Sequence, residues 1–292
     1  MKLLIFGAGV IGSLYAERLF EHGHEVTLIA RGKRLEELRT NGLRYYRNGT
    51  IHTCRIPVRE VPDPDTTYDV VLVAVKEYQL RSALEALRTC RSDTVCPMVN
   101  TLDSYQAMEE IVGKGRILPA FPGAGGGFRD GVLDAAFTPG WIQPTTFGEI
   151  DGSYTPRIRR LKQLFRLAGI PCAAVSDMHA WQLCHLGLVV PLADAYYNTS
   201  EPMRAGHDWS LMKHTAGTIR KNLNQLQKSG VTISPVKLNA LRLLPTTVTA
   251  IGLGVVYRSA FGMRFMYAHA MKAPEEMKRL HELFEYALEE LK

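Results

Sequence analysis

Residues 1–31 constrain the fold more than any other part of the chain. An apolar run at 3–6 is too short for a core helix, and the sequence GAGVIG follows it at 7–12, which favours a buried parallel strand that ends in a tight turn. Residues 13–22 have helical character, and a second apolar strand follows at 25–29. A strand, a GxGxxG turn, a helix and a strand in this order are typical of a dinucleotide-binding unit; the alternative is a glycine-rich turn without a ligand.

Each glycine of this loop has its own task in such a site. Gly7 permits the turn, Gly9 lets a phosphate approach the backbone, and Gly12 lets the helix pack closely on the strand. The N-terminus of the helix offers free N–H groups and a partial positive charge to a pyrophosphate. We therefore expect the whole loop to bind the cofactor: Gly7, Ala8, Gly9, Val10, Ile11 and Gly12.

The residue that follows the second strand predicts which dinucleotide binds. NAD sites usually place a carboxylate there to accept a hydrogen bond from the ribose 2′-hydroxyl. This chain has Arg31 instead, which can pair with a 2′-phosphate, and Lys33 or Arg34 can add charge. The sequence therefore predicts NADP rather than NAD, and the alternative is that these are solvated charges after a strand.

Composition bounds the remaining functions. The 292 residues suffice for two domains with real cores, and the formal charge of +6 is scattered. Without a long basic run we expect no nucleic-acid partner, and no stretch is apolar and long enough to span a membrane. The N-terminus reads as a strand rather than a signal peptide, and the cysteines are odd in number and lack metal-ligand spacing. We expect a cytoplasmic protein with reduced thiols and no metal; the cysteines are Cys54, Cys90, Cys96, Cys172 and Cys184.

Strand-like and helical runs alternate as far as residue 176, which predicts an α/β domain with a doubly wound parallel sheet of Rossmann type over 1–176. Two of its buried strands, at 69–75 and 95–99, are followed by Lys76 and Asn100. Because parallel sheets place ligands at the carboxyl ends of their strands, both side chains are candidate cofactor residues; the alternative is a solvent-facing strand end.

Two other stretches of this domain have distinctive turn residues. Asn48-Gly49, between apolar runs at 43–46 and 51–55, predicts a hairpin. The sequence PGAGGG at 122–127 predicts either permissive backbone where the sheet meets a ligand or a plain flexible loop.

Residues 177–292 have helical patterns and predict an all-α second domain. One long apolar helix is expected over 178–197, with a break near Pro191, and a second over 208–229. The last helix starts near Ala273-Pro274 and runs to the C-terminus. Apolar helices of this kind are compatible with a homodimer as well as with a single buried core.

Over essentially its whole length the chain resembles the ketopantoate reductase (2-dehydropantoate 2-reductase) family. The features that match are GAGVIG with Arg31, VVLVAVK ending in Lys76, VCPMVN ending in Asn100, FPGAGG at 121–126, Trp181 and PEEM at 274–277. The resemblance implies that the glycine loop and Arg31 hold NADPH, that Lys76 and Asn100 line cofactor and substrate, and that Glu276, beside Glu275, contacts substrate. It also implies reduction of a 2-keto acid by NADPH, as in pantothenate biosynthesis.

The chain departs from the family pattern where the proton donor is expected. The resemblance implies a lysine two residues after Trp181, followed by asparagines four and eight residues later. These positions hold Leu183, Gly187 and Pro191, and Thr101 replaces a glycine after Asn100. A leucine cannot donate a proton, so either another group does so or ketone reduction is lost.

His185, on the same predicted helix, is the best replacement donor, because histidine can transfer a proton near neutral pH. A pair of His185 with Glu276 would resemble a general acid oriented by a carboxylate; His269 lies seven residues before Glu276, close to two turns if one helix carries both. The predicted catalytic residues are thus His185, Glu276 and Asn100. The alternatives are a hydrogen-bonded core histidine and a first-turn glutamate favoured by the helix dipole.

Two kinds of function follow from this pattern. The first is an NADPH-dependent reductase of a small 2-keto acid or related carbonyl, with hydride transfer in a cleft between the domains. The second is a non-catalytic NADP(H)-binding sensor, which the missing lysine favours. An opine-type or imine dehydrogenase would share the architecture and act on a C=N group.

Overall fold

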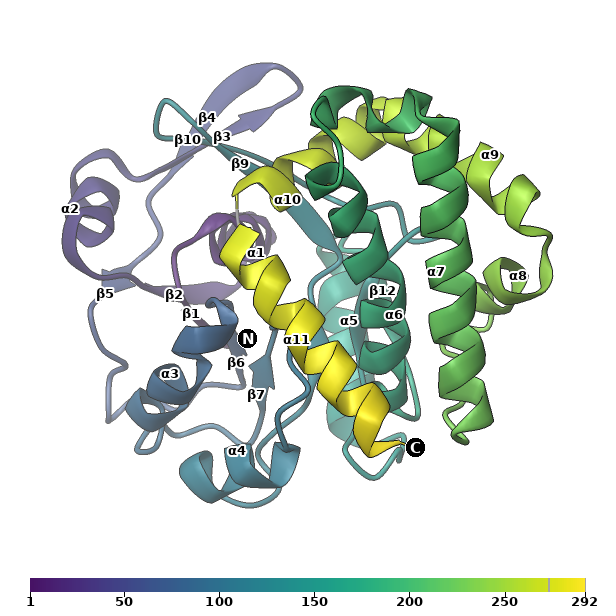
Figure 1. The fold of residues 1–292 in the computed structure, drawn as a ribbon. Coiled ribbons are helices and arrows are strands. Elements are labelled where there is room, and N and C mark those ends of the chain that lie inside the picture. The colour runs from purple at the N-terminus through teal and green to yellow at the C-terminus, as the bar shows by residue number, and fades with distance from the viewer. Residues whose placement is uncertain (273, 292) are drawn as a thin grey trace. The chain divides into compact units, whose positions relative to one another are not determined.

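The computed structural model describes residues 1–272 and 274–291 (Figure 1). The chain divides into two compact units, Met1–Met178 and His179–Lys292, and each unit is described by itself.

The first unit is built on a five-stranded sheet in which neighbouring strands are parallel, in the order β5-β2-β1-β6-β7. Its strands are β1 (Lys2–Phe6), β2 (Glu25–Ile29), β5 (Val58–Arg59), β6 (Val70–Val73) and β7 (Val95–Pro97). From β1 the chain proceeds to β2 and β5 on one side and then crosses to β6 and β7 on the other. The strand order therefore reverses between β1 and β6, which confirms the predicted doubly wound topology.

Helices cover both faces of this sheet: α1 (Val10–Glu21), α2 (Gly32–Asn41), α3 (Leu80–Ala86), α4 (Tyr105–Val112) and α5 (Pro156–Leu167). Alternate strand residues point to opposite faces, so Leu3 and Ile5 join one core with α1, α2 and α5, whereas Leu4 and Phe6 join a second core with α3 and α4. The near-continuous apolar runs of these strands follow from this double burial.

A second sheet has the order β4-β3-β10-β9. Its strands are β3 (Leu43–Arg47), β4 (Thr50–Cys54), β9 (Ala124–Arg129) and β10 (Val132–Phe137). The β3–β4 hairpin is confirmed, with positive φ at both Asn48 and Gly49. The expectation of a loop at 122–127 is wrong for its second part, because residues from Ala124 onward form β9 and pair with β10.

A small third sheet, β12-β11-β8, completes the unit. Its strands are β8 (Ala120–Phe121), β11 (Thr145–Phe147) and β12 (Cys172–Ala174). Before and within β8, isolated parallel bridges join Ile117 to Val95 and Ala120 to Met98.

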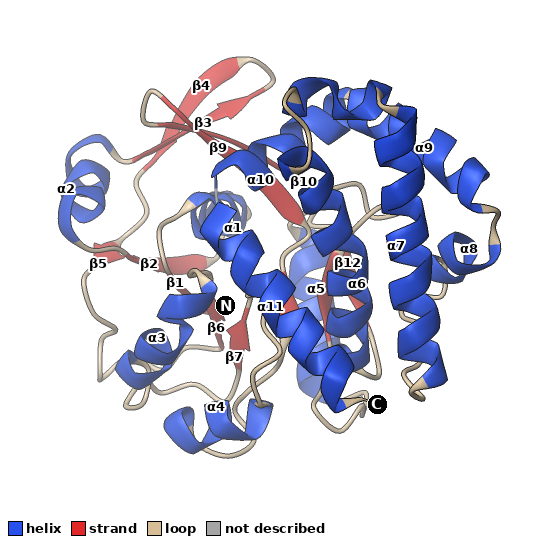
Figure 2. Cartoon of the chain, in the orientation of Figure 1, coloured by secondary structure: helices blue, strands red, loops and turns tan. Residues whose placement is uncertain are grey.

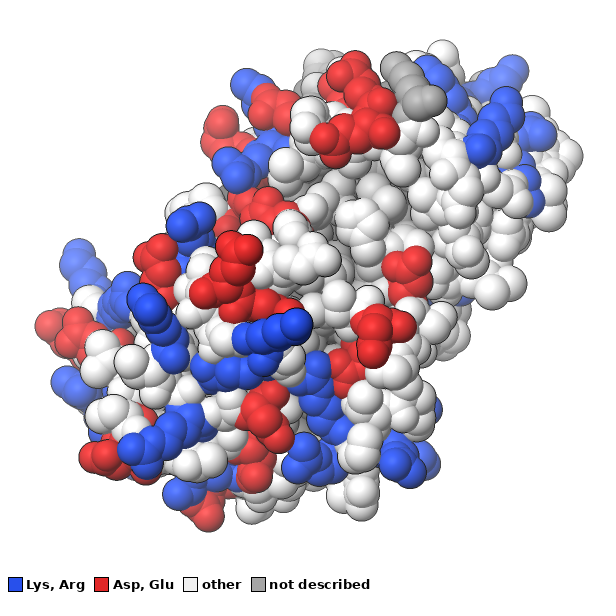
Figure 3. Space-filling view, turned by 90° about the horizontal axis from the view of Figure 1, so that it is seen from below, with Lys and Arg blue, Asp and Glu red and all other residues white. Residues whose placement is uncertain are grey.

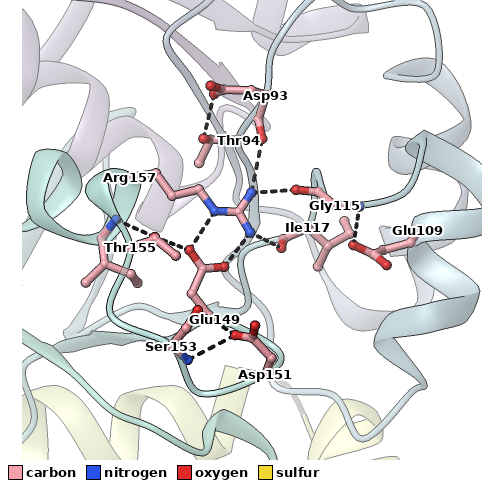
Figure 4. A network of polar contacts seen from close by, with 11 residues as sticks. Asp93, Thr94, Glu109, Gly115, Ile117, Glu149, Asp151, Ser153, Thr155 and Arg157 are labelled. Atoms are coloured by element: carbon pink, nitrogen blue, oxygen red, sulfur yellow. Dashed lines mark hydrogen bonds and ion pairs between the residues drawn. The ribbon is translucent and has the colours of Figure 1, made fainter.

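An ion pair between the half-buried Arg157 and the buried Glu149 joins the loops at the amino ends of β7 and β8 (Figure 4). Arg157, in the first turn of α5, donates from Nε to Glu149 Oε1 (2.8 Å) and pairs with the other carboxylate oxygen through Nη2. Its remaining donors reach the carbonyl oxygens of Asp93 (3.1 Å), Gly115 (2.7 Å) and Ile117 (3.1 Å). The hydrogen bond with Glu149 raises the pKa of Arg157, so the guanidinium stays charged inside the protein.

The second unit is helical in Figure 2 from α6 onward. Its elements are α6 (Met178–Tyr197), η2 (Pro202–His207), α7 (Trp209–Lys228), α8 (Leu238–Leu243), α9 (Thr246–Arg258), η3 (Gly262–Tyr267), α10 (Ala268–Lys272) and α11 (Pro274–Glu290). The predicted start of the last helix at Ala273 lies outside the described residues, and α11 begins at Pro274. The sequence analysis did not predict α9 as a separate helix.

The expected break at Pro191 is wrong, because α6 continues through it. Proline has no N–H to give to the carbonyl oxygen four residues earlier, which belongs to Gly187. In this structure Asn222 of α7 supplies the missing donor, with its Nδ2 3.2 Å from Gly187 O. The side chain of a neighbouring helix thus satisfies the carbonyl that proline leaves open, and the helix has no reason to end there.

Charged side chains are mixed on the face drawn in Figure 3, where Lys and Arg lie between Asp and Glu. Among the residues that the structure describes, no helix has the length and hydropathy needed to cross a bilayer. Within the same residues there is no group of three or more His, Cys, Asp or Glu side chains that could hold a metal ion.

Candidate dinucleotide-binding site

The glycine loop lies where the strand order of the main sheet reverses. Gly7 follows β1 directly, and its N–H donates to Ile29 O at the end of β2 (3.2 Å). Its φ is +111°, and a Cβ at this position would lie 2.4 Å from Ala74 O, just beyond β6. Only glycine fits between the ends of β1 and β6, which is the place where doubly wound sheets bind their ligands.

Gly12 and Gly9 differ in what surrounds them. A Cβ on Gly12 would lie 1.8 Å from Gly7 O, so this glycine allows α1 to pack on the loop. A Cβ on Gly9 would meet no atom within 4 Å, although its φ of −72° suits any residue. Gly9 is also the N-cap of α1, and having no side chain it leaves the first N–H groups of the helix to an outside acceptor. This open space beside a helix N-terminus fits a pyrophosphate.

Arg31 ends the segment after β2 and is the N-cap of α2, with extended backbone. Its guanidinium carbon lies 5.9 Å from the centre of the Phe6 ring, at the end of β1 and therefore close to the glycine loop. The side chain is exposed and forms no ion pair with any residue of 1–272 or 274–291. An exposed, uncompensated guanidinium at this place can bind a phosphate.

Arg34 is placed differently from the other charges of this segment. Lys33 is exposed, whereas the guanidinium of Arg34 points back to the loop and reaches Ala8 O, Ser13 Oγ and Glu37. Arg34 was predicted to add positive charge for the cofactor phosphate. In the structure its guanidinium is already bonded to groups of the protein, and its role toward the cofactor stays a prediction.

Lys76 and Asn100 occupy matching positions at the carboxyl edge of the sheet. Val73 of β6 is in register with Pro97 of β7, and each polar residue lies three positions further along its chain. Lys76 is exposed, with its amino nitrogen 5.9 Å from the centre of the Tyr78 ring. The Oδ1 atom of Asn100 is buried and has no hydrogen-bond partner among the described residues, so it is free to accept from a ligand.

The predicted catalytic residues of the second unit lie on α6 and α11. His185 is 8% exposed, and its ring stacks on Trp181 with centres 5.0 Å apart. Leu183, at the position where the resemblance implies lysine, is buried. Glu276 lies half-buried in the first turn of α11. Its pairing with His185 stays a prediction, and the arrangement that involves the His269 side chain lies outside the described residues.

A cavity of about 410 Å³ opens between α6 and α11 in the same unit. It is lined by Asp194, Tyr197, Pro274, Glu275, Lys278, His281 and Glu282. Burial raises the pKa of Asp194, although His281 Nδ1 lies 3.1 Å from its carboxylate and opposes the shift. The sequence analysis did not single out Asp194 or His281. Asp194 lies eleven residues after Leu183, three turns along the same face of α6, whereas His281 comes from α11.

The parallel sheet and the glycine loop define a Rossmann-type unit, which is followed in the chain by a helical unit. Residues 3–152 match the model of the family described as ketopantoate reductase PanE/ApbA. The chain belongs to this family, as the motifs around the loop, Lys76 and Asn100 had indicated.

Individual relatives agree with this assignment. The chain is 29% identical over 192 residues to an uncharacterized oxidoreductase, YkpB, of Bacillus subtilis, covering 61% of this chain and 58% of that protein. It is 26% identical over 221 residues to a 2-dehydropantoate 2-reductase of Archaeoglobus fulgidus, covering 74% and 71%.

Solved structures share the fold at low sequence identity. A 2-dehydropantoate 2-reductase of Geobacter metallireducens is 18% identical, with a TM-score of 0.69 and full coverage of both chains. A ternary complex of D-mandelate dehydrogenase with NADH and anilino(oxo)acetate is 16% identical, with a TM-score of 0.64, covering 100% of this chain and 99% of that one.

Proposed function

We propose that the protein is an NADPH-dependent reductase of a small 2-keto acid or related carbonyl, similar to 2-dehydropantoate 2-reductase. The observation that carries the proposal is the exposed, unpaired Arg31 beside a glycine loop whose Gly9 faces open space. The loop and the start of α1 would hold the pyrophosphate, and Arg31 the 2′-phosphate. NADH in the D-mandelate dehydrogenase complex supports a nicotinamide cofactor in this fold, and Arg31 favours the phosphorylated form.

In this proposal the bound dihydronicotinamide supplies a hydride to the carbonyl carbon. Lys76 and Asn100 follow the carboxyl ends of β6 and β7, beside the proposed cofactor site, and would orient the reacting groups. Asn100 can accept through its buried Oδ1, which accepts no hydrogen bond from any described residue. The oxygen that becomes an alkoxide needs a proton, and His185 is the proposed donor. Glu276 is the proposed substrate contact, and its neighbour Glu275 lines the cavity of the second unit.

The experiment is a titration of the protein with NADPH and with NADH, followed by absorbance assays with a panel of 2-keto acids that includes ketopantoate. We expect tighter binding of NADPH and oxidation of NADPH by at least one acid of the panel. Arg31→Ala should weaken NADPH about tenfold or more and leave NADH unchanged, because only the phosphate contact is lost. Equal affinity of the wild type for both dinucleotides would contradict the assignment of Arg31.

His185→Gln tests the donor separately. The amide keeps the polar character of the side chain but cannot transfer a proton, so turnover should fall about a hundredfold while NADPH affinity stays the same. Unchanged turnover would remove His185 from the mechanism and leave water as the donor.

One observation favours a second candidate, a non-catalytic NADP(H) sensor. Leu183 is buried and apolar at the position where the resemblance implies the proton donor. A sensor would bind NADPH as tightly as a reductase does, but no carbonyl compound of the panel would cause NADPH to be oxidised. The panel should therefore also contain 2-keto acids with ammonia or amino acids, since turnover only with these would indicate an imine dehydrogenase.

The proposed partner is thus a small carbonyl compound, and the proposed location is the cytoplasm. A homodimer also stays a proposal; α9 exposes the apolar side chains of Val248, Ile251 and Val255, and the mass of the particle in solution tests it.

A further inference from the structure

The geometry points to Arg34 as a positioning residue for the cofactor pyrophosphate, acting through the carbonyl group of Ala8 rather than by touching a phosphate. This inference rests on the proposed function, because it presumes that a dinucleotide binds at the glycine loop. It assigns to Arg34 a task different from that of Arg31, although the two arginines are three residues apart.

The first step is that the donors of Arg34 are already used inside the protein. Its Nε lies 3.2 Å from Ala8 O, its Nη1 2.9 Å from Glu37 Oε2, and its Nη2 3.3 Å from Ser13 Oγ. The guanidinium carbon lies 4.4 Å from the centre of the Phe128 ring, so β9 covers one face of the group. The charge of Arg34 is balanced by Glu37, and three of its five N–H donors are directed to protein acceptors, which holds the guanidinium against the loop.

The second step concerns the peptide that follows Ala8. Ala8 O accepts from Arg34 Nε and also from Ser13 Oγ (3.1 Å), so two donors from different helices fix its direction. In a planar trans peptide the carbonyl and the N–H point in opposite directions. Holding Ala8 C=O therefore aims the N–H of Gly9 away from Arg34, and around Gly9 no atom lies within 4 Å of the place that a Cβ would take.

The third step is the consequence for binding. An N–H that already points at the bound anion costs no reorganisation when a pyrophosphate arrives. Both NADPH and NADH carry this pyrophosphate, whereas only NADPH carries the 2′-phosphate. Loss of Arg34 should therefore weaken both dinucleotides by the same factor, and loss of Arg31 should weaken NADPH alone.

The test compares Arg34→Gln, Arg34→Lys, Arg31→Ala and the control Arg39→Gln. Arg39 is exposed on the same helix, so its change matches the loss of charge without touching the loop. Dissociation constants for NADPH and NADH are measured well below the unfolding temperature. We expect Arg34→Gln to raise both constants about tenfold, Arg34→Lys to raise them less because one amino group can still reach Ala8 O, and Arg39→Gln to raise neither.

A spectroscopic readout separates positioning from mere stabilisation. In ³¹P spectra of bound NADPH, Arg34→Lys should shift the pyrophosphate resonances and leave the 2′-phosphate resonance in place. Arg31→Ala should do the opposite. A purely structural role would lower the melting temperature of Arg34→Gln without changing either resonance or either constant, and this result would overturn the inference.

Two further outcomes are decisive. If Arg34→Gln weakens NADPH and leaves NADH unchanged, Arg34 binds the 2′-phosphate directly and the inference is wrong. If the wild type binds neither dinucleotide, the proposed function itself fails, and this outcome is recognised before any variant is made.

Discussion

At the scale of single residues, Gly9 and Gly12 belong to one motif but are required for different reasons. A Cβ at Gly12 would collide with Gly7 O, whereas a Cβ at Gly9 would enter open space. We expect Gly9→Ala to keep its melting temperature and lose NADPH affinity about a hundredfold, because the methyl group fills the place of the phosphate. Gly12→Ala should lower the stability by roughly 2 kcal/mol. Thermal melts and cofactor titrations of both variants check this, and a stable Gly12→Ala protein would contradict it.

The cysteines give a prediction about pH at the same scale. Burial raises the pKa of Cys96 and of Cys54 to about 12. The folded protein thus holds these protons more tightly than the unfolded chain, and the stability that this provides is lost as the pH rises from about 9 through about 12. At pH 8 iodoacetamide should leave Cys96 unmodified in the folded protein and alkylate it in urea, as mass spectrometry would show. Rapid alkylation of folded protein would mean that the thiol is accessible.

At the scale of elements, the passage of α6 through Pro191 depends on α7. Asn222→Leu would leave Gly187 O buried without a donor, at a cost of roughly 2 kcal/mol in unfolding free energy. Pro191→Ala returns an N–H to the helix and should at least halve that cost. Urea unfolding of the two single variants and the double variant measures the coupling. Equal costs in both backgrounds would show that the amide of Asn222 does not replace the missing N–H.

The Glu149–Arg157 pair gives a second prediction for the elements, because it joins α5 to the loops before β7 and β8. Glu149→Gln should destabilise the protein by roughly 3 kcal/mol, since it leaves the half-buried guanidinium of Arg157 without its carboxylate. Asp151→Asn, an equal loss of charge on an exposed residue nearby, should change stability by less than about 0.5 kcal/mol. NADPH affinity should not change in either variant. The network lies at the amino ends of the strands, whereas the glycine loop lies at their carboxyl ends.

At the scale of the whole molecule, the cofactor should act as a stabiliser. A ligand present at about 100 times its dissociation constant adds about 2.7 kcal/mol to the folded state, which corresponds to a rise in Tm of roughly 5–10 °C for a chain of this size. Scanning calorimetry with and without NADPH measures the shift. If the two units melt in separate transitions, the transition of Met1–Met178 should carry it, since that unit holds the loop.

Much of the fold could be predicted where the signal is local. The β1–loop–α1–β2 segment, the hairpin at Asn48-Gly49 and the bounds of α6 follow from short-range periodicity and turn chemistry. The glycine-rich β9 was missed, because strand pairing with β10 overrides the low β-propensity of three consecutive glycines. The break at Pro191 was expected wrongly, because the donor that rescues the helix comes from Asn222, thirty-one residues later.

In the candidate site, too, residues with a local sequence signal could be predicted and those that depend on long-range contacts could not. The positions of Gly7, Arg31, Lys76 and Asn100 could be predicted from sequence, because each lies one to three residues after a strand of the parallel sheet, and their roles in binding stay predictions. The separation of Arg34 from Arg31 could not, since it depends on Phe128 and Ser13 meeting one guanidinium from two other elements. The roles of His185 and Glu276 still rest on the resemblance.

The packing around Gly187 also bears on how this helix can change over evolutionary time. A Cβ there would lie 3.3 Å from Phe284 Cζ and 3.6 Å from Asn222 Cβ, so the asparagine that the resemblance implies at this position would force α7 or α11 to move. An asparagine in place of Pro191 would return the missing N–H and make the amide of Asn222 redundant, but it would not create room at Gly187. Gly187→Asn made alone should therefore lower the stability of the helical unit, because the new side chain has no room between α7 and α11. The residues that α6 accepts at position 187 are thus set by the packing of α7 and α11 against it.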